Sequence, residues 1–188
     1  MESSVSTPPA GAGSARPSDA RLVRRAQRGS RDAAALLFHR HWPGARRAAL
    51  AVTGSEAMAD DVAQDAFERA FAALERFDAS RPFAPWLHRI AVNRALDVMR
   101  RERRLTSLGE APELAAPAPA LGDGPDPEAL GALAQLSPER RAVVVLRYLL
   151  DYNPPEIAAM LDLPLGTVNS RLARALAELR ERLGGERG

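Results

Sequence analysis

The chain has 188 residues, which is enough for one ordinary domain or for two small ones. Hydrophobic residues make up 46% of it, aromatic residues are few, and apolar and polar residues almost never alternate, so we expect an all-α fold. The absence of cysteine excludes disulfides, thiolate catalysis and thiolate zinc sites, while all 26 basic residues are arginine and leave a net charge of only +2.

Residues 1–18 form a tail rich in Pro, Ala, Gly and Ser, which we predict to be disordered. The tail has no apolar segment of the kind found in signal peptides, and no run in the chain approaches the roughly 20 apolar residues of a membrane span. We therefore expect a cytoplasmic protein with no membrane insertion.

The first folded part, residues 19–104, is predicted to be a bundle of four or five helices. A first helix can be capped at residues 18–19 and stops near Gly29. Ser30 can cap a second helix, and Pro43 suits the first turn of a third. Each expected boundary coincides with a capping or helix-breaking residue.

A fourth helix is expected from about Glu56 to Phe77, with an apolar stripe facing the bundle. After a loop, a fifth helix runs from about Ala84 to Arg104. The outer surface of the fourth helix carries Asp61, Gln64, Asp65 and Glu68. We expect the fifth helix to bury Trp86, Leu87, Ile90, Ala91, Ala95 and Val98. It ends in the arginine cluster Arg100, Arg101, Arg103 and Arg104, which can bind phosphates or simply satisfy the carbonyls of the helix end.

Residues 105–136 are dense in Ala, Pro and Gly, and they contain acidic residues but no basic one. Such a composition buries too little surface to offset the entropy of ordering, so we predict a flexible acidic linker. The exception is a short helical stretch near Pro127 to Leu136.

The second folded part, residues 137–184, begins with LSPERRAVVVLRYLL. Val143 to Leu150 could form a strand, because β-branched residues dominate it. The preceding Ser137-Pro138-Glu139 favours a helix instead, since it supplies a cap, a proline at the first helical position and an acid in the first turn. A short helix from Pro155 to Leu161, a turn, and a long helix from about Leu165 to Leu183 follow. Residues 185–188 are a second tail.

The hairpin around LDLPLGTVNSR has the spacing of a helix-turn-helix. Val168, Leu172 and the leucines that follow form one apolar stripe, so that Thr167, Ser170 and Arg174 fall on the open face. Such a face suits base edges in the major groove, and it also suits a solvated corner between two packed helices. The hairpin alone leaves both interpretations open.

The two parts together resemble a known family. DDVAQDAFERAFAALERFDASRPFAPWLHRIAVNRALDVMRRERR, followed by LSPERRAVVVLRYLL and EIAAMLDLPLGTVNSRLARALAELRERL, resembles the extracytoplasmic-function (group IV) sigma factors of bacterial RNA polymerase. The resemblance covers about residues 20–183. It implies two small helical domains, sigma region 2 and sigma region 4, joined by the linker.

The resemblance implies specific roles for residues of the first part. Core polymerase, through the clamp helices of its β′ subunit, is expected to bind Asp61, Gln64, Asp65 and Glu68. The following loop is expected to capture a base flipped out of the −10 element, which offsets the few kcal/mol that base extrusion costs. The −10 candidates are Asp78, Ser80, Phe83, Asn93, Arg94, Asp97, Arg100, Arg101, Arg103 and Arg104.

The resemblance also assigns the second part and the partners. Region 4 is expected to contact the β flap of the polymerase and to read the −35 element of the promoter DNA through Thr167, Asn169, Ser170, Arg171 and Arg174. An anti-sigma factor is a possible further partner. No cofactor and no metal is implied, and the protein is expected at the nucleoid when it is bound to polymerase. The acidic linker either follows the RNA-exit path of the polymerase or is a plain tether.

Three departures from the family pattern stand out. Asn153-Pro154-Pro155 replaces a Leu-Ser/Thr-Tyr-Glu-like run, so the first hairpin helix is expected to start later. Asp162 stands where a turn glycine is common, and Asp65 stands where Glu is usual. Asp tolerates the left-handed conformation better than most residues do, though less well than glycine.

Other functions were weighed against this one. A stand-alone helix-turn-helix regulator would use only the hairpin, and a helical adaptor would bind no DNA. No acid/base pair or phosphate loop indicates an enzyme. His39 and His41 point apart on a helix, which favours partly exposed helix-end residues over a metal site, and His88 is expected at the surface. We expect Trp42, Trp86, Phe67 and Phe71 in the core, whereas Phe83 could stack on a base.

Overall fold

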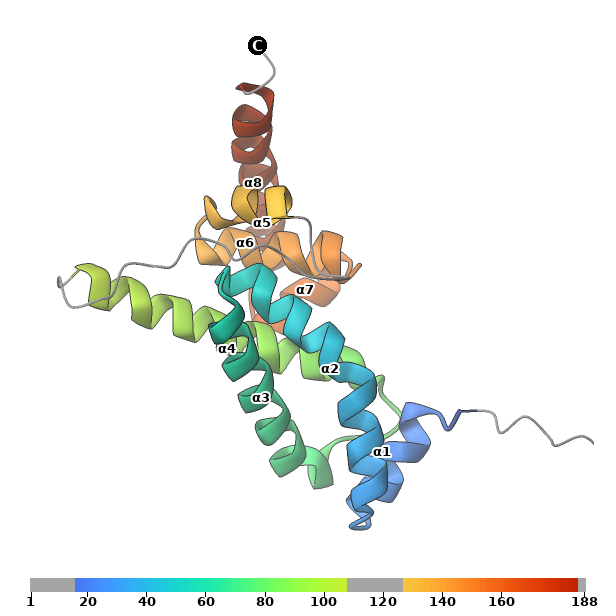
Figure 1. Cartoon of the computed structure of the whole chain (residues 1–188). Helices are drawn as coiled ribbons and strands as arrows, with labels where there is room; N and C mark the ends of the chain where they lie inside the picture. The colour runs from blue at the N-terminus through green and yellow to red at the C-terminus, as the bar shows by residue number, and fades with distance from the viewer. Residues whose placement is uncertain (1–15, 108–126, 186–188) are drawn as a thin grey trace, which may run out of the picture.

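The structure is a computed structural model that describes residues 16–107 and 127–185. Within these two ranges every regular element is a helix, and the elements form two helical domains, as the sequence predicts (Figure 1). Across the same ranges, no helix combines the length and the apolar character needed to cross a bilayer. Most of both expected tails and most of the expected linker lie outside the described residues.

The first domain is a bundle of four helices, α1 (Asp19–Gln27), α2 (Arg31–Thr53), α3 (Glu56–Ala73) and α4 (Phe83–Ser107), with a short 3₁₀ turn, η1 (Leu74–Arg76), after α3. Serine side chains cap the first three helices, because Ser18, Ser30 and Ser55 each accept a hydrogen bond from a backbone N–H of the first turn. Gly54 ends α2 with φ of 73°, a left-handed conformation that costs glycine little.

The prediction that Pro43 begins a separate helix was wrong, because α2 runs through it without a break. A proline inside a helix removes one backbone hydrogen bond and costs roughly 3 kcal/mol. Here Pro43 is exposed at the surface, while the α2 residues on both sides of it are packed. Leu37 lies in the core before the proline, and Ala45, Ala48 and Ala49 lie in the core after it. Tertiary packing therefore keeps one continuous helix.

Phe83 does not lie in the loop as predicted. It is the first residue of α4, its side chain is only 1% exposed, and it contacts the rings of Phe77 and Trp86. Phe83 therefore belongs to the core, and in this structure it offers no face to a base. Leu87, Ala91 and Ala95 are buried as expected, whereas Trp86, Ile90 and Val98 are half-buried.

The second domain contains α5 (Pro127–Ala134), α6 (Pro138–Val144), the π-helical turn η2 (Val145–Leu149), α7 (Pro154–Leu161) and α8 (Leu165–Gly185). The helix α5 is the short helical stretch expected at the end of the linker, and Leu130 and Leu136 are buried against the rest of the domain. Ser137 caps α6 with Pro138 in its first turn, and the segment after it is helical. The helical interpretation of Val143 to Leu150 is confirmed.

The hairpin tolerates both departures from the family pattern. Asn153 and Glu156 form a reciprocal capping box, with Pro154 at the first helical position of α7. Asp162 ends α7 in the left-handed conformation, with φ of 53°. The capping box therefore stabilises the start of α7, and Asp162 adopts the positive φ that the turn after α7 requires.

The two domains share a hydrophobic core. One buried cluster joins Leu50 and Val52 of α2 and Val92 of α4 with Val143 and Ile157 of the second domain. The second domain packs against the C-terminal end of α2 and along α4, whose last turns project beyond it (Figure 1). At their junction Arg141 is 4% exposed, and it donates to the carbonyl oxygens of Val52 at 2.6 Å, Ala134 at 2.7 Å and Leu136 at 3.2 Å.

Candidate functional site

The outward face of α3 forms the first candidate site. Asp61, Gln64, Asp65 and Glu68 line one hollow of about 350 Å³ together with Arg69 and Arg94. The buried face of the same helix, with Val62, Ala66 and Phe67, holds it against the bundle. The structure thus brings together the four residues that the resemblance assigns to polymerase binding.

Asp65 forms ion pairs with both arginines of this hollow. Its carboxylate accepts a hydrogen bond from Arg69 Nε at 2.9 Å and pairs with Arg94 on the neighbouring helix. The hydrogen bond from Arg69, with the charge of Arg94, lowers the pKa of Asp65 below its usual range. Arg94, which the sequence grouped with the −10 residues, therefore faces the α3 hollow instead.

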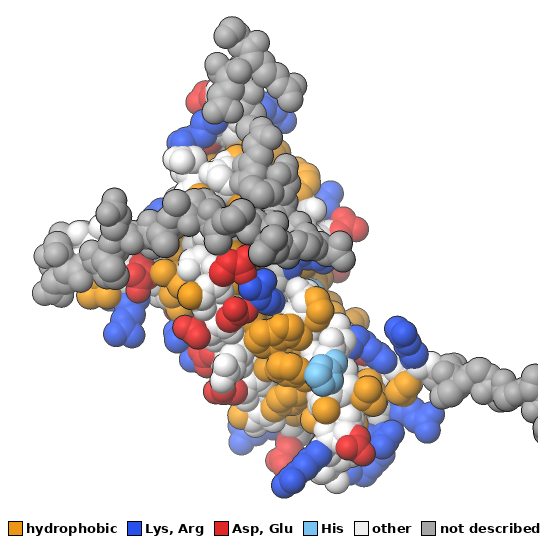
Figure 2. All heavy atoms as spheres, in the orientation of Figure 1, with side chains coloured by type: hydrophobic (Ala, Val, Ile, Leu, Met, Phe, Trp, Pro, Cys, Tyr) orange, Lys and Arg blue, Asp and Glu red, His pale blue; other side chains and the backbone are white. Residues whose placement is uncertain are grey.

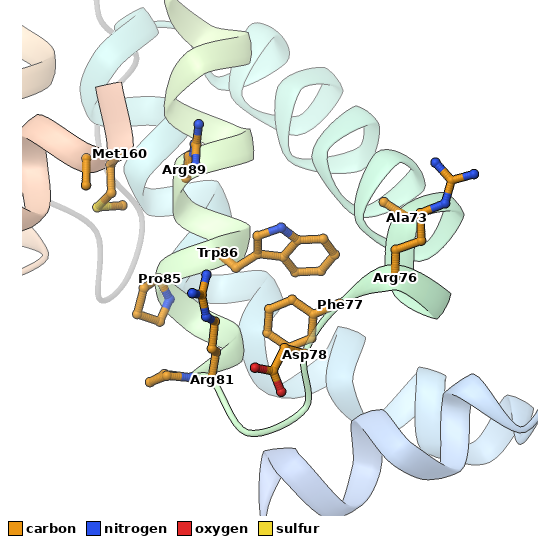
Figure 3. A pocket seen from close by; sticks show the side chains of 11 residues that line it. Ala73, Arg76, Phe77, Asp78, Arg81, Pro85, Trp86, Arg89 and Met160 are labelled. Atoms are coloured by element: carbon orange, nitrogen blue, oxygen red, sulfur yellow. The ribbon is translucent and has the colours of Figure 1, made fainter. Parts of the chain in front are cut away.

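A larger hollow, of about 530 Å³, lies beside the loop between η1 and α4 (Figure 3). The stacked rings of Phe77 and Trp86, with centroids 4.4 Å apart, form an aromatic wall. Asp78 shapes the loop, because its Oδ1 accepts hydrogen bonds from the backbone N–H and the hydroxyl of Ser80, and these bonds lower the pKa of Asp78. The hollow combines an aromatic surface with a positively charged rim, as sites for unstacked bases do.

The sequence analysis missed the arginines of this rim. Arg76, Arg81 and Arg89 line the hollow from three different segments; Arg76 precedes the loop that the resemblance had singled out, and Arg81 lies within it. Their position beside the loop was the available signal. Ala159 and Met160 of α7 complete the lining from the second domain.

The remaining −10 candidates lie along α4 rather than in the hollow. Asn93 is half-buried and donates from Nδ2 to the carbonyl oxygen of Met160 at 3.2 Å, so the second domain covers it here. Arg100 pairs with Glu139 at 3.3 Å and with Asp97 at 3.5 Å. Arg101, Arg103 and Arg104 are exposed near the end of the helix. In this arrangement the ten candidates do not form one continuous surface.

The −35 candidates lie at the N-terminal end of α8. Asn169, Ser170 and Arg174 are exposed, Thr167 and Arg171 are half-exposed, and Val168, Leu172 and Ala175 on the opposite face are buried. Ser170 donates from Oγ to the carbonyl oxygen of Thr167 at 3.0 Å. Leu183, which the sequence placed in the same stripe, lies outside the described side chains. The polar face of α8 is therefore open, as expected.

None of the histidines lies at a helix end, although His39 is exposed and His41 is half-exposed, as expected. His39 and His41 lie within the continuous α2, where His41 Nε2 lies 2.8 Å from Asp19 Oδ2. His88 is only 9% exposed, with Nδ1 2.8 Å from the hydroxyl of Tyr152 in the second domain. Burial raises the pKa of Tyr152 to about 12, so its hydroxyl keeps its proton. The surface position predicted for His88 was wrong, because α7 and its flanking turn cover it.

The burial of His88 predicts a pH dependence of stability. Burial, with the nearby positive charges of His41 and Arg47, lowers the pKa of His88 to about 4. An unfolded chain binds this proton near pH 6.5, so the contribution of His88 to stability is complete above about pH 6.5 and is lost as the pH falls towards 4. The loss amounts to about 3 kcal/mol in the free energy of unfolding.

Urea titrations between pH 7 and pH 4 measure how the free energy of unfolding falls with pH, with His88→Gln as the matched control. The variant keeps every other titrating group, so its stability is expected to fall less over the same interval. Parallel pH profiles for the two proteins would show that His88 does not titrate differently in the folded state.

Comparison with known proteins gives the family. Residues 37–105 match the family profile described as Sigma-70 region 2, and residues 128–179 match Sigma-70, region 4. The chain is 33% identical over 160 residues to the RNA polymerase sigma factor CarQ of Myxococcus xanthus, covering 83% of this chain and 92% of that one. The chain belongs to the extracytoplasmic-function sigma factors of RNA polymerase. This sigma factor directs promoter-specific transcription initiation.

Other relatives agree. The sigma factor is 34% identical over 172 residues to CnrH of Cupriavidus metallidurans, covering 84% of this chain and 90% of that one. It superimposes on CnrH in complex with the cytosolic domain of CnrY with a TM-score of 0.67 and 32% identity, over 89% and 97% of the two chains. RpoE of Bartonella quintana, in complex with the anti-sigma factor NepR, gives a TM-score of 0.68 and 26% identity, over 79% and 95%. Members of this family are in general non-catalytic regulators of transcription.

Proposed function

We propose that the two domains of this sigma factor divide promoter recognition between them. The first domain docks on the β′ clamp helices through the α3 hollow and holds a flipped base of the −10 element in the loop hollow. The second contacts the β flap and reads the −35 element with α8. The observation that carries the proposal is the loop hollow, where an aromatic wall, three arginines and a structured loop meet.

The charge distribution supports the first half of this proposal. The α3 hollow contains carboxylates that are partly neutralised by Arg69 and Arg94, whereas the residues of the loop hollow are mainly arginines and aromatics. A nucleic acid would be repelled by the first surface and attracted by the second. We therefore assign polymerase binding to Asp61, Gln64, Asp65 and Glu68, and DNA binding to the loop side.

The −10 assignment changes in three places. Asp78 and Ser80 are proposed to shape the loop, and Phe83 to support it from the core. Asn93 and Arg100 would contact the strand or its phosphates only after the second domain moves away, because Asn93 is bonded to Met160 and Arg100 to Glu139. Binding to polymerase would cause that movement, because the first domain would dock on the β′ clamp helices and the second on the β flap. The other candidates of this helix, Asp97, Arg101, Arg103 and Arg104, are already exposed.

The partners and the location complete the proposal. RpoE of Bartonella quintana has been solved with an anti-sigma factor, and we propose that an anti-sigma factor also restrains this chain. We further propose that the protein works in the cytoplasm, at the nucleoid, without catalysing a reaction itself. The stand-alone regulator is the weaker alternative, because it leaves the α3 and loop hollows without a use.

Polymerase docking is tested by mixing the purified chain with core RNA polymerase and measuring complex formation by gel filtration. We expect a one-to-one complex, from which an added second sigma factor displaces the chain. Sequence-specific binding to duplex DNA without polymerase, combined with no binding to core, would favour the stand-alone regulator.

Arg174→Ala tests the proposed −35 contact. Arg174 is exposed on the open face of α8, where a guanidinium can bond guanine O6 and N7. The variant is expected to lose about 1–3 kcal/mol of binding at one or two positions of the −35 element and little at the others. Holoenzyme binding to a set of single-base promoter variants measures this, and an equal loss on every sequence would make Arg174 a phosphate contact.

A further inference from the structure

We propose that α1 is a second DNA-binding surface, which holds the phosphates of the single strand that flanks the base in the loop hollow. The surface, called here the α1 arginine face, consists of Arg21, Arg24, Arg25 and Arg28. This inference rests on the proposed function of the loop hollow and extends it to a helix that the sequence comparison assigns no role.

The α1 arginine face follows from the helical geometry. Positions 21, 24, 25 and 28 recur at the spacing of one helix face, while Leu22 and Val23 on the other side are buried in the core. Arg21, Arg24 and Arg28 are exposed, and Arg25 is half-exposed. Figure 2 shows arginine side chains gathered at the end of the molecule where α1 lies.

In the part of the chain that the structure describes, these arginines have no acidic partner, in contrast to Arg40, Arg46, Arg69 and Arg94 of the same domain. Arg40 pairs with Asp19, and Arg46, Arg69 and Arg94 pair with carboxylates of α3. Among the described residues, no carboxylate forms an ion pair with any member of the α1 arginine face. The only acid of α1, Asp19, is held by Arg40 and His41. The positive potential of this face is therefore available to an anion.

The α1 arginine face is fixed next to the loop hollow. Gln27 donates from Nε2 to the carbonyl oxygens of Leu74 at 3.0 Å and Phe77 at 2.8 Å, and Phe77 is part of the aromatic wall. The helix α1 also contacts η1 and α4 (Figure 1). The bonds from Gln27 place α1 beside Phe77, which lines the hollow together with Arg76 and Arg81.

An aromatic platform beside a row of unpaired cations is the arrangement that proteins use for single-stranded nucleic acid. A base held in the hollow would fix the strand, and its neighbouring phosphates would then lie within reach of α1. Contacts of this kind position a strand without reading its sequence. The partner of the α1 arginine face is therefore the phosphates of the melted DNA strand. The competing partner is an acidic surface of the polymerase, and the experiment must distinguish the two.

The experiment uses holoenzyme reconstituted with the full chain. Arg21→Gln/Arg24→Gln is compared with Arg180→Gln/Arg182→Gln, which removes the same charge from the exposed C-terminal turns of α8. The probe is a fluorescent single-stranded oligonucleotide with the −10 element of a promoter mapped for this sigma factor, with flanking nucleotides on both sides. A second probe lacks the flanks. Dissociation constants are measured over a range of salt concentrations.

The α1 variant is expected to bind the flanked probe several-fold to tenfold more weakly than wild type, with a salt dependence shallower by about 1.4 for two lost phosphate contacts. The short probe should bind both proteins equally, and the α8 control should behave as wild type. Equal binding of the flanked probe by the α1 variant and wild type would overturn the inference. So would an equal loss in the α8 control, or a loss confined to affinity for core polymerase. Failure of the wild-type chain to bind core polymerase would instead reject the proposed function.

Discussion

Replacing Arg141 with methionine is expected to lower the free energy of unfolding by about 3 kcal/mol and to separate the two domains. The guanidinium is buried and donates to three carbonyl oxygens, one of them, that of Val52, in the first domain. Burial lowers the pKa of Arg141 to about 10, so the group is charged at neutral pH. Methionine keeps much of the side-chain volume but leaves the three buried acceptors without donors.

The neighbouring residue offers a matched control. Arg140 is half-exposed and pairs with Glu178 within the second domain, so Arg140→Met is expected to cost less than about 1 kcal/mol. Urea unfolding measures the stability, and small-angle X-ray scattering measures the separation of the domains. If the two variants lose equal stability and stay equally compact, Arg141 does not hold the domains together.

Reversing the charge of Asp65 is expected to weaken binding to core polymerase by on the order of 100-fold or more, because like charges across an interface cost several kcal/mol. In Asp65→Arg the new cation would lie beside Arg69 and Arg94, and the α3 hollow would change from acidic to basic. Asp65→Asn keeps the shape and removes only the charge, so a smaller loss is expected.

Two further measurements separate docking from folding. Glu75→Arg makes the same change in charge on the exposed turn η1, outside the α3 hollow, and it should leave the affinity for core polymerase unchanged. Thermal unfolding of all three variants identifies any that are destabilised. Unchanged affinity in a folded Asp65→Arg variant would remove the α3 hollow from the polymerase interface.

Local chemistry made much of the fold predictable. Some helix boundaries depend only on interactions within a few residues, so they follow from the sequence. They are the boundaries at the serine caps, at Gly54 and at Ser137-Pro138. The apolar stripe of α8 likewise predicts which side chains face out. Pro43 shows the limit of such rules, because packing on both sides of it overrides the helix-breaking preference.

The contacts between the domains could not be predicted in this way. Arg141 and Val52 are 89 positions apart, and Asn93 and Met160 are 67 apart, so no local pattern links them. The burial of Phe83 and His88 depends on residues distant in the chain, because Phe83 contacts the ring of His41 in α2 and His88 contacts Tyr152 in the turn before α7. The arginines around the loop hollow are close to one another in the chain, so their position beside the loop could have indicated them.

Start-site-resolved transcription by core polymerase and the purified chain tests the central claim most directly. The template is a genomic library in linear duplex form, and the reaction contains nucleotides but no activator. A sigma factor of this kind is expected to give initiation at a defined set of sites that share one −10 element and one −35 element at fixed spacing, with no initiation from core polymerase alone. Initiation that is equally scattered with and without the chain would contradict the claim.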